Sequence, residues 1–311
     1  MRHFAPIVLF IYKRPAHLEA TLKSLLRCEG FADSKVIVFA DGPKGQQDLI
    51  DVTAARQIAQ EQLGLRAEYC FYDTNRGLAA SIINGIDNVI GRFGRAIIVE
   101  DDLEVAPNFL LYMNAALDRY EERAEVFQIS GHMFDAPEFR VRTSALFLPF
   151  TTTWGWATWR RAWDRFDPSA VGWEALLSDR ALRTRFNLGG AYNYSAMLER
   201  QMAGVEDSWG IRWYWSVFRS GGVACFPPIS FVRNTGLDGS GTHGRGAFRH
   251  FRRSVDSLEN RMIGLPDAVS VDPGDVAAVR RAIWQDNGGW IGASADRMRY
   301  QFRQFPRRFT R

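Results

Sequence analysis

The feature that most constrains the fold is an alternation of short apolar runs with amphipathic stretches in the first 130 residues. Residues 7–12 are apolar without interruption, as expected for a strand covered on both faces. Pro15 then opens a stretch in which leucines recur at helical spacing. Further strands are expected at residues 36–40, 68–72, 96–99 and 127–130, and helices within 47–62, at 78–93 and at 108–123. This order predicts an α/β fold with a mostly parallel, Rossmann-like sheet flanked by helices.

The rhythm breaks after Gly131. The expected elements are then an extended segment at 140–150, two or three short helices before Glu206, a helix at 209–219 and a strand at 223–226. The last 60 residues are expected to form a peripheral helical extension. We therefore divide the chain into residues 1–130, 131–250 and 251–311.

The composition excludes several classes of protein. Of the 311 residues, 46% are hydrophobic and 24% are charged, which is ordinary for a folded chain and excludes wholesale disorder. The apolar run at residues 7–12 is far shorter than the roughly 20 residues that cross a bilayer, and it lacks the cleavage site of a signal peptide. Three widely spaced cysteines form neither a disulfide framework nor a zinc motif, which indicates a reducing cytoplasm.

Charged residues follow each of the first four expected strands. Arg14 comes after the first strand, Asp41 after the second, Asn75 and Arg76 after the third, and an acidic triplet after the fourth. Ligands of open parallel sheets bind outside the carboxyl ends of the strands. A mixture of arginines and acids at that edge suits a diphosphate together with a divalent metal.

The triplet Glu100-Asp101-Asp102 is the most informative of these segments. Three consecutive carboxylates repel one another unless a cation or hydrogen-bond donors compensate them. Mg²⁺ and Mn²⁺ prefer oxygen ligands, often one or two carboxylates plus substrate phosphates. Alternatively, the acids cap the next helix, but that helix is expected to begin nearer Asn108.

Several other site motifs are missing from the sequence. It contains no G-x-G-x-x-G after the first strand, no P-loop, no H-E-x-x-H and no G-x-S-x-G. A nucleotidyltransferase remains an alternative, disfavoured because no glycine-rich basic loop follows the first strand. A non-catalytic carbohydrate-binding protein is a further alternative, disfavoured by the intact acidic segments.

The segment Val99-Glu100-Asp101-Asp102-Leu103-Glu104-Val105-Ala106-Pro107 resembles the metal-binding signature of GT-A glycosyltransferases. It is most similar to that of the N-acetylglucosaminyltransferase I family, and the resemblance extends over about residues 5–245. The chain also resembles bacterial polysaccharide glycosyltransferases at residues 154–159 and 238–243. The resemblance implies metal-dependent, inverting transfer of a sugar from a nucleoside-diphosphate donor, most readily a UDP-sugar. The acceptor would be a hydroxyl of a glycan or a lipid-linked glycan, in bacterial polysaccharide or glycoconjugate synthesis.

The resemblance also implies roles for single residues. Asp102 would ligate Mn²⁺ or Mg²⁺, and Glu100 and Asp101 would contact the ribose and the donor sugar. The remaining donor contacts would be Asp41 to the nucleobase, Arg14 to the diphosphate, and Asn75 and Arg76 to the nucleotide. Residues 1–130 would then bind the nucleotide sugar, 131–250 would form the acceptor-side subdomain, and 251–311 a basic helical extension.

An inverting transfer needs a carboxylate that takes the acceptor proton, and it must lie opposite the metal. The best candidate is Glu206-Asp207, where the related enzymes carry an acidic pair before a tryptophan. Asp207 is favoured and Glu206 is the alternate. Asp207 or Ser208 could instead cap the helix at 209–219.

Aromatic and glycine-rich segments complete the expected site. Most of the ten tryptophans fall in the second half, and Trp154, Trp156 and Trp209 are the candidates for an acceptor platform, although buried core is the alternative for such residues. The loop at 236–246 has the backbone freedom of a lid, and His243 within it could reach the metal or the diphosphate. A plain surface turn is the alternative there.

The C-terminal segment Arg297–Arg311 contains six arginines interleaved with large apolar residues and no acid. Such a pattern favours an anionic membrane surface as partner, and a solvated helix is the alternative. Nucleic acid is not expected, because the chain has no zinc-finger, RRM or KH pattern. The predicted location is the cytoplasm, with peripheral attachment to the inner face of the cell membrane as a refinement.

Overall fold

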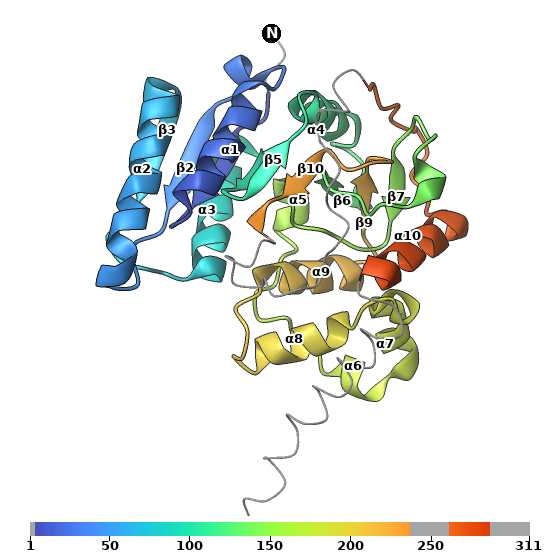
Figure 1. Ribbon diagram of the computed structural model, residues 1–311. Helices are drawn as coiled ribbons and strands as arrows, with labels where there is room; N and C mark the ends of the chain where they lie inside the picture. Colours follow the sequence, from blue (N-terminus) through green and yellow to red (C-terminus); the bar gives the residue numbers. More distant parts are fainter. Residues whose placement is uncertain (1–3, 237–260, 287–311) are drawn as a thin grey trace, which may run out of the picture.

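Four parallel strands form the first half of the central sheet. The computed structural model of the protein describes residues 4–236 and 261–286. The strands lie in the order β3-β2-β1-β4. Figure 1 labels the edge strand β3 and its neighbour β2. Their bounds are Ile7–Ile11 (β1), Val36–Ala40 (β2), Ala67–Phe71 (β3) and Arg95–Glu100 (β4). The predicted α/β fold with a mostly parallel sheet is confirmed, and the four strands lie within one residue of where the apolar runs predicted them.

The second half extends the same sheet to eight strands. Beyond β4 the order continues β8-β6-β9-β7, with β8 antiparallel to both of its neighbours. The bounds are Val126–Ser130 (β6), Leu146–Leu148 (β7), Trp156–Trp159 (β8) and Val223–Phe226 (β9). The sequence did not predict strand β8, because its four residues lie in a run of aromatic and basic side chains without alternation. A separate two-stranded ribbon pairs β5 (Leu103–Val105) with β10 (Val232–Asn234).

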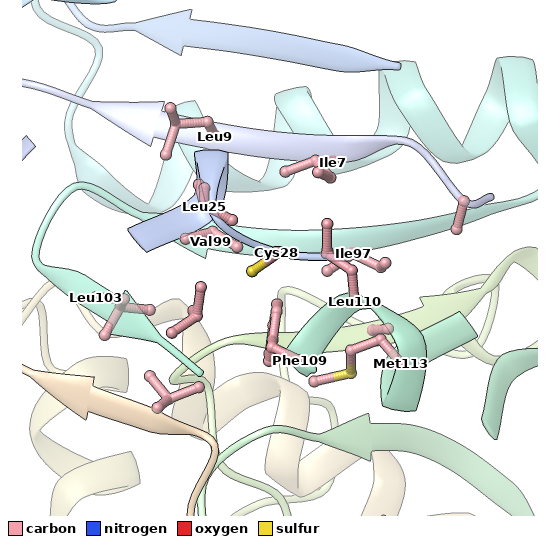
Figure 2. Packing of buried hydrophobic residues seen from close by; sticks show 14 of the residues in the cluster. Ile7, Leu9, Leu25, Cys28, Ile97, Val99, Leu103, Phe109, Leu110 and Met113 are labelled. Carbon is pink, nitrogen blue, oxygen red and sulfur yellow. The ribbon is translucent and has the colours of Figure 1, made fainter. Parts of the chain in front are cut away.

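Side chains of alternate residues in β1 enter two different cores. Ile7 and Leu9 pack with α1 (Pro15–Leu26), α2 (Leu49–Leu63) and α4 (Phe109–Arg119), as Figure 2 shows for part of this cluster. Val8 and Phe10 face the opposite side, which α3 (Leu78–Phe93), α5 (Arg160–Trp163) and α9 (Trp209–Arg219) cover. Both faces of the sheet are therefore buried, as its continuous apolar strands require.

Helices of the second half surround another core. They are α6 (Ala175–Ser178), α7 (Arg180–Phe186), α8 (Tyr194–Met202) and α10 (Pro273–Asp286), packed with α9 against β7 and β9. The predicted short helices before Glu206 are thus present. Helix α10 was expected to be peripheral, but it buries Ala278, Val279, Ala282 and Ile283 in this core. Its apolar residues recur at helical spacing, and so one face is covered by the core.

Short 3₁₀ helices occupy several connections. They are η1 (Phe31–Asp33), η2 (Gln46–Asp48), η3 (Gly64–Arg66), η4 (Pro137–Phe139) and η5 (Leu188–Gly190). In the described part of the chain, no helix has both the length and the apolar character needed to span a membrane. Most of the predicted lid loop, His243 and the arginine-rich segment lie outside the described residues.

Replacement of Trp213 by Phe is expected to destabilise the protein by about 1–3 kcal/mol. The indole N–H of Trp213 on α9 donates to Gln128 Oε1 on β6 at 2.7 Å, and both side chains are completely buried. Phenylalanine leaves that amide oxygen buried without its donor. Urea unfolding measures the change. The control is Trp173→Phe, because Trp173 is partly buried at the edge of the core that α6, α7, α8 and α10 surround. Equal stability of the two variants would contradict the importance of this bond.

Candidate functional site

A cavity of about 510 Å³ lies between the carboxyl ends of the parallel strands and the beginning of α9. It brings together side chains from both halves of the chain. The predicted site residues that line it are Arg14, Asp41, Asn75, Glu100, Asp101, Asp102, Trp154, Asp207 and Trp209. Segments as far apart in the sequence as those of Arg14 and Trp209 therefore border one space, as the strand-end rule predicts for the first half.

The acidic triplet forms the turn between β4 and β5. Asp101 is almost fully buried, and its Oδ2 accepts a hydrogen bond from the backbone N–H of Tyr12 at 2.9 Å. Asp102 Oδ2 accepts from Arg14 Nη1 at 2.6 Å, and its carbonyl oxygen accepts from the Thr235 N–H at 2.8 Å. The triplet does not cap α4, because Asn108 occupies the position before that helix. The capping alternative is therefore wrong for this segment.

Burial raises the pKa values of two carboxyl groups in this turn. Burial, reinforced by the neighbouring charges of Asp102 and Asp101, raises the pKa of Glu100 to about 8. Burial likewise raises the pKa of Asp101 to about 6, against the opposing effect of Arg14. A further cation at this place would relieve the repulsion that the single guanidinium of Arg14 leaves.

The donor set fits a divalent metal only in part. Within residues 4–236 and 261–286, no group of three His, Cys, Asp or Glu side chains is arranged to hold a metal ion. Asp102 nevertheless presents a carboxylate to the cavity beside Glu100 and Asp101. Such a set suits Mn²⁺ or Mg²⁺ held by one or two carboxylates together with substrate phosphates, which complete the shell.

Asp41 organises the loop between β3 and α3. Its Oδ1 accepts hydrogen bonds from the N–H groups of Gly42 at 3.0 Å and Arg76 at 2.8 Å, and its Oδ2 accepts from Gly77 at 3.0 Å. The side-chain amide of Asn75 donates to the Gly42 carbonyl at 2.9 Å. Gly77 adopts φ +86°, a conformation that favours glycine. Asp41 is therefore a structural anchor of this loop as well as part of the cavity wall.

The guanidinium of Arg76 lies away from the cavity. It sits over the ring of Tyr72, 3.7 Å from the ring centroid, and is not among the residues that line the cavity. The backbone N–H of Arg76 donates a hydrogen bond to Asp41, which lines the cavity. The nucleotide contact that the resemblance assigned to Arg76 stays a prediction.

The side chains of Asp207 and Glu206 lie in different surroundings. Asp207 lines the cavity, and its Oδ2 accepts from the Ala79 N–H at 3.3 Å, in the first turn of α3. Glu206 instead pairs with Arg200 Nε at 2.5 Å and does not line the cavity. Ser208 precedes α9 without a side-chain capping bond. The helix-cap alternative for Asp207 or Ser208 is therefore wrong, and Asp207 is the carboxylate that faces the site.

The three candidate tryptophans have different surroundings. Trp154 lines the cavity and packs edge-on against His132, with ring centroids 4.6 Å apart. Trp209 also lines it, although only 3% of its surface is exposed. Trp156 has no exposed surface and stacks on Trp209 at 5.5 Å. Trp156 is a core residue, because β8 turns its side chain toward α3 and α9, and it cannot contact an acceptor.

Sequence reasoning missed several residues of the cavity wall. Tyr12 and Lys44 follow β1 and β2, so the strand-end argument applied to Arg14 and Asp41 could have found them. The Tyr12 hydroxyl donates to Asp48 Oδ2 at 2.8 Å, which holds the loop that carries Lys44. Ser81 and Thr151 also line the cavity, and their buried hydroxyls have no hydrogen-bond partner in the described part of the chain. No sequence pattern marked these two.

Replacement of Asp41 by Asn is expected to loosen the β3–α3 loop and to cost about 1–3 kcal/mol of stability. An amide keeps one acceptor oxygen but turns an NH₂ group toward one of the N–H donors, which then loses its bond. Hydrogen exchange should speed up at the amides of Arg76 and Gly77. The control is Asp73→Asn in the same exposed loop. Unchanged exchange in Asp41→Asn would contradict the anchoring role.

A protein-family model that matches the chain agrees with this architecture. A solved structure that is similar is described as the mannosyltransferase PcManGT from Pyrobaculum calidifontis in complex with GDP-Man and Mn²⁺; it is 12% identical, the match covers 70% of each chain, and the TM-score is 0.40. The model of the family described as Glycosyl transferase family 2 matches residues 7–179. Because this match spans more than half of the chain, the protein belongs to glycosyl transferase family 2 and is a glycosyltransferase.

Proposed function

We propose that this enzyme moves a sugar from a nucleoside-diphosphate donor to a hydroxyl group of an acceptor with inversion at the anomeric carbon. The observation that carries the proposal is that the acidic turn after β4 and the carboxylate of Asp207 border one cavity from different halves of the chain. The acidic turn would supply carboxylate ligands for the metal that a diphosphate needs, and Asp207 would supply the base.

The donor would lie along the carboxyl ends of β1, β2 and β4. Asp102 would ligate Mn²⁺ or Mg²⁺, and Arg14, already 2.6 Å from Asp102, would extend the positive charge toward the diphosphate. When bound, the metal would supply positive charge for the departing diphosphate. Glu100 and Asp101 would contact ribose and sugar hydroxyls, and the nucleobase would lie near Asp41 and Asn75.

The acceptor would enter from the side of α9. Its hydroxyl oxygen would form a bond to the anomeric carbon while the bond from that carbon to the phosphate oxygen breaks. The carboxylate of Asp207 would take the hydroxyl proton, and the nucleoside diphosphate would leave with the bonding electron pair. Trp154 and Trp209 would form the acceptor platform.

The finer assignments rest on the resemblance to N-acetylglucosaminyltransferase I and to bacterial polysaccharide enzymes. They are a UDP-sugar donor, a role in bacterial polysaccharide or glycoconjugate synthesis, and the three-part division at residues 130 and 250. The arginine-rich segment from Arg297 to Arg311 would hold the enzyme at an anionic membrane surface. Incubation with UDP-, GDP- and dTDP-sugars plus Mn²⁺ tests the class of reaction. Release of nucleoside diphosphate is expected, whereas release of pyrophosphate would indicate a nucleotidyltransferase and no release a binding protein.

Replacement of Asp102 by Asn is expected to weaken Mn²⁺-dependent nucleotide binding by at least ~10-fold, because the neutral amide is a poor metal ligand. Calorimetric titration of UDP and GDP with and without Mn²⁺ measures this effect. Asp118→Asn serves as control, since Asp118 is an exposed carboxylate paired with Arg95 at 2.6 Å. Equal affinities in the parent and in Asp102→Asn would remove Asp102 from the metal site.

Replacement of Asp207 by Asn is expected to lower turnover by at least ~100-fold while donor affinity stays unchanged, because the amide cannot take the proton but its oxygen can still accept from the Ala79 N–H. Glu206→Gln is the matched control, since Glu206 is engaged by Arg200 away from the cavity. Steady-state kinetics with saturating donor separate the two. If Glu206→Gln loses turnover and Asp207→Asn does not, the base is Glu206.

A further inference from the structure

The cavity has two chemically different ends. Its charged end is lined by residues that follow β1, β2 and β4, including Arg14, Lys44 and the acidic triplet. Its apolar end is lined by residues of the second half and of α10: Phe134, Tyr194, Met197, Ile211, Tyr214 and Ile283. Most of the apolar end lies outside residues 7–179, which the family model matches.

The apolar end contains no cation in the described part of the chain. Beyond residue 130, Asp207 is the one acidic side chain among the described residues of the lining, and no Lys or Arg joins it. Burial lowers the pKa of His132 to about 3, so this ring is neutral at physiological pH. A phosphate or carboxylate placed there would lose its hydration and meet no opposite charge.

Rings and methyl groups form the wall of this end. Tyr214 is buried and uses its hydroxyl to donate to the Phe186 carbonyl at 2.9 Å, so it offers the cavity carbon surface. Tyr194 packs edge-on against Tyr214 with centroids 5.3 Å apart. Such a wall favours hydrocarbon, whose transfer from water needs no hydrogen-bond partner.

The position of the apolar end along α9 relates it to the reacting hydroxyl. Asp207 lies just before the helix, and Ile211 and Tyr214 come four and seven residues later in the chain. Counted from Trp209, the first residue of α9, with about 1.5 Å of rise per residue, the backbone of Ile211 and that of Tyr214 lie roughly 3 and 8 Å along the helix axis. Because Asp207, Ile211 and Tyr214 all line the cavity, an acceptor whose hydroxyl lies at Asp207 can extend along α9 toward the apolar end.

From this arrangement we propose that the apolar end binds an uncharged hydrocarbon group joined to the acceptor sugar, which makes the acceptor a neutral glycoside of an alkyl or aryl alcohol. The proposal rests on the function proposed above, because it takes Asp207 as the place of the reacting hydroxyl. A sugar joined through phosphate to a lipid is disfavoured, since its phosphate would fall in the part of the cavity whose described lining holds no Lys or Arg.

Calorimetry with three forms of one sugar tests the proposal: the methyl glycoside, the hexyl glycoside and the sugar 1-phosphate. Glucose, galactose, mannose and N-acetylglucosamine are tested in turn, with and without UDP or GDP and Mn²⁺. For at least one sugar, the hexyl form should bind at least ~10-fold tighter than the methyl form, which burial of about two methylene groups provides. Equal binding of the two forms for every sugar, or tightest binding of the 1-phosphate, would overturn the proposal.

Variants on α8 test whether the preference for the hexyl glycoside arises at the apolar end. Met197→Gln should reduce the preference for the hexyl form to below ~3-fold, because it places an amide in the apolar end, whereas Met197→Leu should preserve it. Met202→Gln is the matched control, since Met202 lies on the same helix, is partly buried and does not line the cavity. A hexyl preference that Met197→Gln leaves unchanged would place the hydrocarbon elsewhere and contradict the proposal.

Sugar transfer is measured separately, so that the two proposals fail in different ways. A hexyl preference without nucleotide binding or transfer would contradict the proposed function and leave the hydrocarbon subsite in place. Transfer with the same KM for methyl and hexyl glycosides would overturn the subsite and leave the proposed function standing.

Discussion

The compensation of buried negative charge after β4 is the constraint on which the site depends. The carboxylate of Asp101 is held by a backbone amide of the β1–α1 connection, and that of Asp102 by the guanidinium of Arg14. Thr235, next to β10, bonds the Asp102 carbonyl through both its N–H and its hydroxyl. The β5–β10 ribbon and the first turn after β1 are thus fixed by the same few polar groups. Because Arg14 and the Tyr12 amide compensate this charge only in part, the edge is where the metal proposed for the donor diphosphate would be held.

The beginning of α3 joins this edge to the second half of the chain. Asp41 accepts the N–H groups of Arg76 and Gly77, and Asp207 accepts that of Ala79. The first amides of a helix lack partners within it, so two carboxylates from distant segments can share one helix end. The loop that borders the proposed donor site and the carboxylate proposed as base are therefore placed relative to each other by hydrogen bonds through one short stretch of backbone.

The sequence was sufficient for the first half of the fold and for much of the charged end of the cavity. Parallel strands read as unbroken apolar runs, and the residue after each run has a known place at the sheet edge, which is why Arg14, Asp41 and the acidic triplet could be placed together. Strand β8 was not predicted, because its residues lie in an aromatic and basic run without alternation. The apolar end left no local pattern either, because it is assembled from α8, α9 and α10, which are far apart in the sequence. Trp156 and Trp209 looked equivalent in sequence, but β8 turns Trp156 fully into the core, whereas Trp209 at the start of α9 reaches the cavity wall.

The tryptophans serve the site mainly by fixing α9. Trp156 contacts Trp209 at 5.5 Å and Trp213 at 5.9 Å, and Trp163 contacts Trp213 at 5.3 Å. Large rings packed in this way leave few alternative rotamers, so the helix cannot shift without opening a cavity in the core. A base must keep its distance from the reacting oxygen within a fraction of an ångström to be effective. The dense packing of Trp156, Trp163, Trp209 and Trp213 is therefore explained by the rigidity it gives α9, which is what the base proposed at Asp207 would need.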